Sequence, residues 1–163
     1  MSSVETLKKK KVLMICLGNI CRSPIAEAVF QNEVNKRGLQ DYWKVESAAI
    51  IGFHVGKKPD NRALDTLMKN GITDYSHKAR QIELSDFYIY DWIFGMDQEN
   101  IKDLINRRPN LDCRAKVELL GSYNPSETII IRDPYYDSGS AGFQKAYDQC
   151  VTCITAFLDK HSN

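Results

Sequence analysis

The chain has 163 residues, with 22 lysines and arginines against 21 aspartates and glutamates, so its formal net charge is only +1. This length is typical of one domain, and it is enough to bury a core without disulfides or a structural metal. Hydrophobic residues make up 43% and charged residues 26% of the chain, which excludes a disordered, collagen-like or membrane-embedded protein. The near-neutral charge gives no global attraction to nucleic acid or to an anionic membrane, so we expect neither as a partner.

Two features of the chain bear on its compartment. The longest apolar run, residues 12–17, has six residues, far short of the roughly 18 that suggest a membrane-spanning helix, and no signal-peptide pattern accompanies it. Five cysteines cannot all pair. A reducing compartment keeps thiols free, so each cysteine is either a small core residue or a chemically active one. We therefore expect a cytoplasmic protein.

The first predicted elements are a strand and a helix joined by a short turn. The run 12–17 follows a cluster of lysines and is typical of a strand buried on both faces of a parallel sheet. Ser23 is a good N-cap and Pro24 suits the first helical position, and the helix is expected to end at Arg37, before Gly38. Residues 1–10 are predicted to be a flexible lead-in to this unit.

The alternation of strand and helix continues along the chain. Strands are predicted at 43–48, 92–96 and 115–120, and helices at 61–70, 99–107 and 143–158. This order predicts a single α/β domain whose mostly parallel sheet is covered by helices on both faces. Ligands of such sheets bind beyond the carboxyl ends of the strands, which is where the turn after the first strand lies.

That turn carries the residues of an anion site. Cys16 stands near the end of the first strand and Arg22 at the start of the helix, with Gly18 and Asn19, which tolerate positive φ, between them. Backbone N–H groups, a helix N-terminus and a guanidinium fork together suit a tetrahedral anion. The same groups stabilise a thiolate, so Cys16 is predicted to be a nucleophile whose sulfur Ser23 can hydrogen-bond. The alternative is a buried strand cysteine and a surface arginine.

The chain closely resembles the low-molecular-weight protein tyrosine phosphatases, whose C-x5-R-S phosphate loop lies near the N-terminus. The segments that carry the resemblance are, in chain order, residues 16–24, Ser76-His77, Met96-Asp97 and Asp133-Pro134-Tyr135-Tyr136. The similarity extends over about 11–161, which we take as the limits of the phosphatase domain. It implies a four-stranded sheet with the phosphate loop between its first strand and first helix.

The resemblance also implies a two-step hydrolysis of phosphotyrosine and aryl phosphates that needs no metal or other cofactor. Cys16 attacks phosphorus, Arg22 and the loop amides neutralise the phosphoryl oxygens, and a phosphocysteine forms. Asp133 is expected to protonate the leaving phenolate and later to take a proton from the hydrolytic water, although an Asp-Pro pair by itself is often only a turn. The residues expected to bind the substrate phosphate are Leu17, Gly18, Asn19, Ile20, Cys21 and Ser23.

Support for the loop is assigned by resemblance alone. Ser23, Ser47 and His77 are expected to hydrogen-bond to Asn19 and so to fix its conformation from behind. Cys21 has two open interpretations: it packs under the loop, or it forms a reversible disulfide with the nucleophile, as in the family.

Three residues bear on substrate choice. Phe53 and Tyr135 match aromatic wall positions of the family, and such walls would select phosphotyrosine over the shorter phosphoserine. For Phe53, simple core packing is an open alternative. Ile20 stands where related bacterial arginine phosphatases carry a smaller threonine, and its bulk favours tyrosine.

Two rival functions fit less well. An arsenate reductase on this scaffold needs two relay cysteines downstream, yet none occurs between Cys21 and Cys113. A non-catalytic phosphotyrosine-binding module typically lacks the nucleophile or the acid, and both are present here. Cys150 and Cys153 are predicted to lie on an amphipathic helix, where they serve in packing and do not bind zinc. We expect phosphotyrosine proteins or small aryl phosphates as substrates, phosphate-like anions as loop ligands, and a monomer or weak homodimer.

Overall fold

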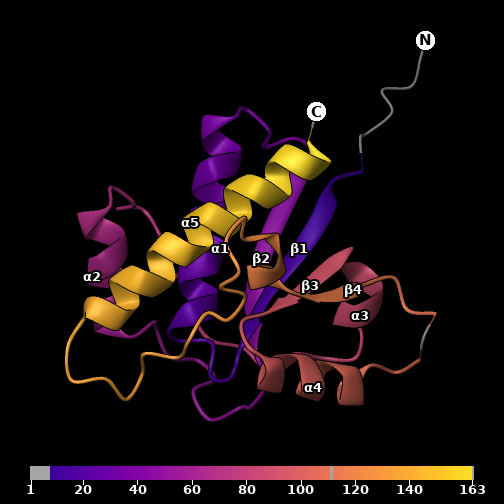
Figure 1. The fold of residues 1–163 in the computed structure, drawn as a ribbon. Coiled ribbons are helices and arrows are strands. Elements are labelled where there is room, and N and C mark those ends of the chain that lie inside the picture. The colour runs from indigo at the N-terminus through magenta and orange to yellow at the C-terminus, as the bar shows by residue number, and fades with distance from the viewer. Residues whose placement is uncertain (1–7, 111, 163) are drawn as a thin grey trace.

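A four-stranded parallel sheet in the order β2-β1-β3-β4 forms the centre of the structure, a computed structural model that describes residues 8–110 and 112–162 (Figure 1). The strands are β1 (Lys10–Cys16), β2 (Trp43–Ala49), β3 (Trp92–Gly95) and β4 (Lys116–Leu119). All three neighbouring pairs run parallel, so the carboxyl ends of all four strands meet at one edge. The predicted α/β fold with a four-stranded sheet is confirmed.

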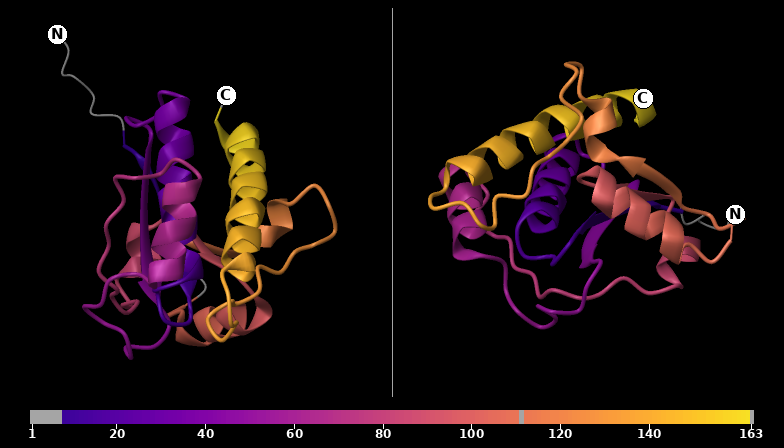
Figure 2. Two further views of the ribbon diagram at one scale, coloured as in Figure 1. Left: turned by 90° about the vertical axis from the view of Figure 1, so that its left-hand side faces the viewer. Right: turned by 60° about the horizontal axis from the view of Figure 1, so that its bottom comes forward.

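Helices cover both faces of this sheet (Figure 2). The helices α1 (Arg22–Lys36), α2 (Asn61–Lys69) and α5 (Ala141–His161) pack together on one face, and α3 (Asp86–Ile89) and α4 (Gln98–Arg107) lie on the other. Side chains of β1 alternate between two core clusters, with Val12 and Met14 in the first and Leu13 and Ile15 in the second. All four are fully buried, as expected for a strand covered on both sides.

Two expectations for the first strand and helix need correction. Lys10 pairs with Trp43 and belongs to β1, whereas residues 1–7 of the predicted lead-in lie outside the described residues. The prediction that Ser23 caps α1 is wrong, because the helix begins at Arg22 and Cys21 holds the N-cap position. The hydroxyl of Ser23 is instead used inside the loop, where it contacts Asn19 and Cys16.

The other helices and strands differ from the predicted ranges by a few residues, and two short elements were not predicted. The helix α2 ends just ahead of Gly71, whose φ of +89° suits glycine. The helix α5 is longer than its predicted range at both ends. The four-residue helix α3 and the 3-10 turn η1 (Leu120–Tyr123) are too short to produce a periodic pattern. None of the helices formed by the described residues has the length and apolar character needed to cross a bilayer.

An aromatic cluster centred on Phe157 fastens α5 to the sheet. The ring of Phe157 is fully buried, and its centroid lies 5.1 Å from those of Trp92 and Tyr123 and 5.5 Å from that of Trp43. The three rings meet it edge-on, a favourable arrangement for aromatic pairs. This contact anchors the helix that follows the Asp133 loop.

We expect Phe157→Ala to lower the free energy of unfolding by about 3–5 kcal/mol, because it opens a cavity among packed rings. Urea denaturation of both proteins measures the change. Phe53→Ala is a matched control, since the Phe53 side chain is 76% exposed and its loss should cost no more than about 0.5 kcal/mol. Equal losses for the two variants would contradict this account of the core.

Candidate active site

The turn between β1 and α1 lies at the carboxyl edge of the sheet, as predicted, and Asn19 determines its shape. Asn19 is the only non-glycine residue with positive φ among the described residues, at +59°, and it is fully buried. Its Nδ2 donates to Ser23 Oγ at 2.8 Å and to Ser47 Oγ at 3.0 Å. Its Oδ1 accepts from His77 Nε2 at 2.7 Å and from the backbone N–H of Arg80 at 3.2 Å. These bonds hold the left-handed conformation from three separate segments.

A second layer of polar side chains supports this network. Ser47 donates its hydroxyl hydrogen to Glu27 Oε1 at 2.6 Å, and Tyr75 donates to the same oxygen at 2.8 Å. Burial raises the pKa of Glu27 above its ordinary value, although these two bonds oppose the shift. Burial and then the charge of Arg80 lower the pKa of His77. His77 is therefore neutral at neutral pH, and its Nε2 carries the hydrogen because Asn19 Oδ1 only accepts.

Arg22, the first residue of α1, places a buried charge beneath the turn. Its side chain is 2% exposed, and Nη1 donates to Asp97 Oδ2 at 2.6 Å and to the Ile131 carbonyl at 2.9 Å. Burial alone would lower the pKa of the guanidinium, but the charges of Cys16, Asp97 and Asp133 outweigh it and raise the pKa. Arg22 Nε is buried and has no hydrogen-bond partner among the described residues. A buried N–H of this kind suits an anionic ligand.

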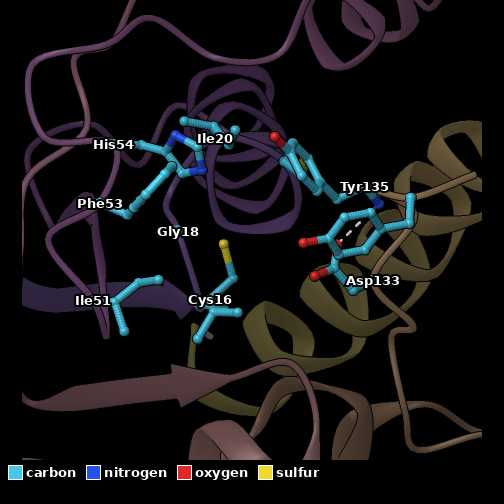
Figure 3. Close-up of a pocket in the computed structure, with 11 residues that line it drawn as sticks. Cys16, Gly18, Ile20, Ile51, Phe53, His54, Asp133 and Tyr135 are labelled. Atoms are coloured by element: carbon cyan, nitrogen blue, oxygen red, sulfur yellow. Dashed lines mark hydrogen bonds between the residues drawn. The ribbon is translucent and has the colours of Figure 1, made fainter.

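The sulfur of Cys16 lies at the centre of a cavity of about 250 Å³ (Figure 3). Ser23 Oγ is 3.0 Å from this sulfur and is placed to donate a hydrogen bond to it. Burial, and next the negative charge of Cys16, raise the pKa of the Cys21 thiol above its ordinary value. The neighbouring cysteine therefore stays protonated beside the Cys16 sulfur.

The loop that carries Asp133 forms the opposite side of the cavity, where Asp133 and Tyr135 face Phe53 and His54 across the sulfur (Figure 3). Asp133 Oδ1 accepts from the backbone N–H of Tyr135 at 3.1 Å, and its Oδ2 lies 3.6 Å from Arg22 Nη2. Phe53 is largely exposed, so the alternative that it packs in the core is wrong. The lining residues are Cys16, Leu17, Gly18, Ile20, Cys21, Ile51, Phe53, His54, Asp133, Tyr135 and Tyr136.

The structure thus brings the sequence-predicted residues to one place. The cavity is lined or bordered by the residues of the turn and by Phe53, Asp133 and Tyr135. Ser47 and His77 hydrogen-bond to Asn19 from outside the cavity. Sequence reasoning missed the partners of buried groups, above all Asp97, Glu27 and Tyr75. It also missed His54, whose ring packs so closely on Gly18 that a Cβ there would lie 2.8 Å from His54 Cδ2. The pair Met96-Asp97 was the one signal available for Asp97.

The comparisons with known proteins decide the family. The model of the family described as low molecular weight phosphotyrosine protein phosphatase matches residues 11–162. The chain belongs to this family. A pig low molecular weight phosphotyrosine protein phosphatase is 51% identical, over 93% of this chain and 95% of its own length.

Solved structures of similar proteins share the fold. The crystal structure of Primo-1 is 44% identical with a TM-score of 0.89, over 94% of this chain and 99% of that one. That of DARP, a Drosophila arginine phosphatase, is 40% identical with a TM-score of 0.88, over 94% and 98%. In the part of this phosphatase that the structure describes, no group of three or more histidine, cysteine or acidic side chains is placed to hold a metal ion.

The state of His77 yields a pH prediction. A histidine whose folded-state pKa is lowered stabilises the protein above the unfolded-state pKa of about 6.5 and loses that contribution as the pH falls below it. We expect the free energy of unfolding of the native protein to fall more steeply between about pH 7 and pH 5 than that of His77→Gln, which keeps an N–H donor but does not titrate. Urea denaturation across this range tests it. Parallel profiles would show that His77 is not buried as a neutral ring.

Proposed function

We propose that this protein hydrolyses phosphotyrosine and other aryl phosphomonoesters through a phosphocysteine on Cys16. The observation that carries the proposal is the Cys16 sulfur at the centre of a cavity that Asp133 also lines. Next to Asp133 lies the buried guanidinium of Arg22, 3.6 Å away, whose Nε has no partner among the described residues. A nucleophile, a charge-stabilising group and a proton donor around one cavity are the parts that transfer of a phosphoryl group requires.

In the first step the Cys16 sulfur attacks phosphorus, an S–P bond forms, and the bond from phosphorus to the aryl oxygen breaks. Arg22 Nε and Nη2, together with the amides of the turn, donate to the equatorial oxygens and stabilise the charge that develops there. Asp133 gives its proton to the departing phenolate. Because a phenol has a pKa near 10, this proton transfer contributes about 10²–10⁴-fold to the rate.

In the second step water attacks the phosphocysteine. The Asp133 carboxylate, now ionised, takes a proton from that water, an O–P bond forms, and the S–P bond breaks to release inorganic phosphate. Ser23 donates its hydroxyl hydrogen to the departing Cys16 thiolate from 3.0 Å, which lowers the energy of the leaving group. Asp133 is then protonated again, so the cycle is closed.

The walls of the cavity support aryl substrates. Phe53 and Tyr135 present aromatic faces around the sulfur (Figure 3), and the flat ring of a phosphotyrosine fills such a space while its phosphate reaches the turn. A phosphoserine is too short to do both. Substrates are therefore phosphotyrosine proteins or small aryl phosphates, and inorganic phosphate and its analogues bind as inhibitors.

The cysteines and the net charge bear on the compartment and the partners of the enzyme. All five cysteines are free thiols in the structure, which suits a reducing cytoplasm. The near-neutral net charge supports a protein that binds neither nucleic acid nor membrane. We further propose that it acts as a monomer or weak homodimer. The arsenate reductase alternative finds no support, because Cys150 and Cys153 are fully buried in the core and are not available for a disulfide relay.

Trapping the intermediate tests the function. Rapid denaturation after mixing with a peptide whose phosphotyrosine carries a labelled phosphate should leave the labelled phosphoryl group on the Cys16 sulfur, without added metal and in the presence of a chelator. Cys16→Ser should form none and should lose at least about 10³-fold in turnover. Cys113→Ser, which alters a thiol outside the cavity, is the control and should label normally. Full activity in Cys16→Ser would refute the proposal.

The bulk of Ile20 gives a prediction about specificity. We expect the native enzyme to prefer phosphotyrosine over phosphoarginine, and Ile20→Thr to shift the ratio of kcat/KM toward phosphoarginine by about tenfold or more, the effect of removing apolar groups from a pocket. Ile51→Thr makes the same change at the exposed rim and should shift the ratio far less. Equal shifts, or a native preference for phosphoarginine, would remove Ile20 from this role.

A further inference from the structure

The loop from Asp133 to Gly139 contacts the body of the protein through two arginines: Arg22, whose Nη2 lies 3.6 Å from Asp133 Oδ2, and Arg62, in the first turn of α2, which binds the loop backbone. Arg62 Nη2 donates to the Tyr135 carbonyl at 2.8 Å, and Nη1 donates to the carbonyls of Asp137 at 2.7 Å and Gly139 at 3.4 Å. One guanidinium thus holds three carbonyls of the same loop. Arg62 does not line the cavity, so its place in the fold is not explained by contact with a substrate.

Asp60 fixes the other side of this guanidinium. Its carboxylate accepts from Arg62 Nε and Nη2, each at 3.1 Å, and caps α2 by accepting from the Arg62 backbone N–H at 2.8 Å. The backbone N–H of Asp60 donates to the Ile20 carbonyl of the phosphate loop at 2.8 Å. A continuous chain of bonds therefore runs from the phosphate loop through Asp60 and Arg62 to the Asp133 loop.

The chain of bonds ends at the carboxyl group of the proposed acid. Tyr135 accepts from Arg62 through its carbonyl, and its N–H donates to Asp133 Oδ1 at 3.1 Å. The guanidinium carbon of Arg62 also lies 4.5 Å above the ring of Phe143, which belongs to α5. The side chain is thus clamped between two helices, and three acceptors fix the loop relative to them.

Arg132 differs from Arg62 in the part of the protein that it contacts. It lies next to Asp133 and pairs with Asp137 at 2.5 Å, but its side chain is 58% exposed. Both partners belong to the same segment, so this pair shapes the loop internally and does not set its position against the phosphate loop. Of these two arginines, only Arg62 connects a helix to the loop.

We propose that Arg62 is a positioning residue that holds the Asp133 carboxyl in register with the phosphate loop, as an inference that rests on the proposed function. A general acid has to lie within hydrogen-bond reach of the leaving oxygen, and a misplacement of about 1 Å can cost on the order of 10²-fold in rate. Loss of the Arg62 contacts is therefore expected to impair proton donation by Asp133 and to leave binding of the anion largely intact.

The test compares leaving groups. We would measure kcat/KM of the native enzyme, Arg62→Met and Asp133→Asn for p-nitrophenyl phosphate, whose leaving group is acidic, and for phenyl phosphate, whose leaving group has a pKa near 10. Inhibition by inorganic phosphate reports the state of the phosphate loop in each protein. Arg37→Met is the matched control, because Arg37 is another ion-paired, partly buried arginine, bound to Asp159 of α5 at 2.9 Å and placed at the far end of α1.

We expect Arg62→Met to lose about tenfold more kcat/KM on phenyl phosphate than on p-nitrophenyl phosphate, in the same sense as Asp133→Asn. Phosphate inhibition should stay within about twofold of native, and Arg62→Lys should recover part of the selective loss. Arg37→Met should show no selective loss. If Arg62→Met does not fold, the ratio for Arg62→Lys decides the question on a smaller scale.

Equal losses on both substrates, or loss of phosphate inhibition in step with activity, would overturn the inference and assign Arg62 a purely structural role. Failure of the proposed function gives a different result. In that case Cys16→Ser keeps its activity and no phosphocysteine forms in the native protein, whatever the Arg62 variants do.

Discussion

The buried guanidinium of Arg22 is the constraint on which the site depends. A charge at 2% exposure is costly unless acceptors and counter-charges surround it, and the fold supplies them from several elements. Asp97 follows β3 and also caps α4 by accepting from Asn100, and the Ile131 carbonyl comes from the segment before the acid loop. The Asp133 carboxyl, 3.6 Å from Arg22 Nη2, completes the set. Sheet topology brings these groups together because all four strands end at the same edge.

The site is built from two parts with different support. The phosphate loop is fixed from within by Asn19, whose left-handed backbone is held by side chains of Ser23, Ser47 and His77. The loop from Asp133 to Gly139 is tied to helix α2 through Arg62, and the Asp133 carboxyl also contacts Arg22. Because Arg62 contacts this loop and does not line the cavity, its substitution is expected to alter acid catalysis with little effect on anion binding.

Much of this arrangement could be predicted from the sequence because it depends on local chemistry. The apolar run before Cys16, the glycine and asparagine of the turn and the arginine six residues after the cysteine identify the anion site without any knowledge of the fold. The partners of Arg22 and Arg62 could not be predicted in this way. Asp97 and Asp133 reach Arg22 from positions far along the chain, and only the packed structure determines which acid meets which arginine. Ser23 shows the limit of local reasoning, since the sequence suited it both to cap α1 and to bind within the loop, and the structure shows only its loop contacts with Cys16 and Asn19.

The central claim is that Arg22 and the turn activate the Cys16 sulfur as a nucleophile, and the rate at which the uncharged reagent iodoacetamide alkylates Cys16 tests it most directly, because only the thiolate reacts. Peptide mapping separates Cys16 from the other four cysteines. The account predicts that, at neutral pH, Cys16 of the native protein is alkylated about tenfold or more faster than Cys16 of Arg22→Met. Equal rates in the two proteins would contradict the account.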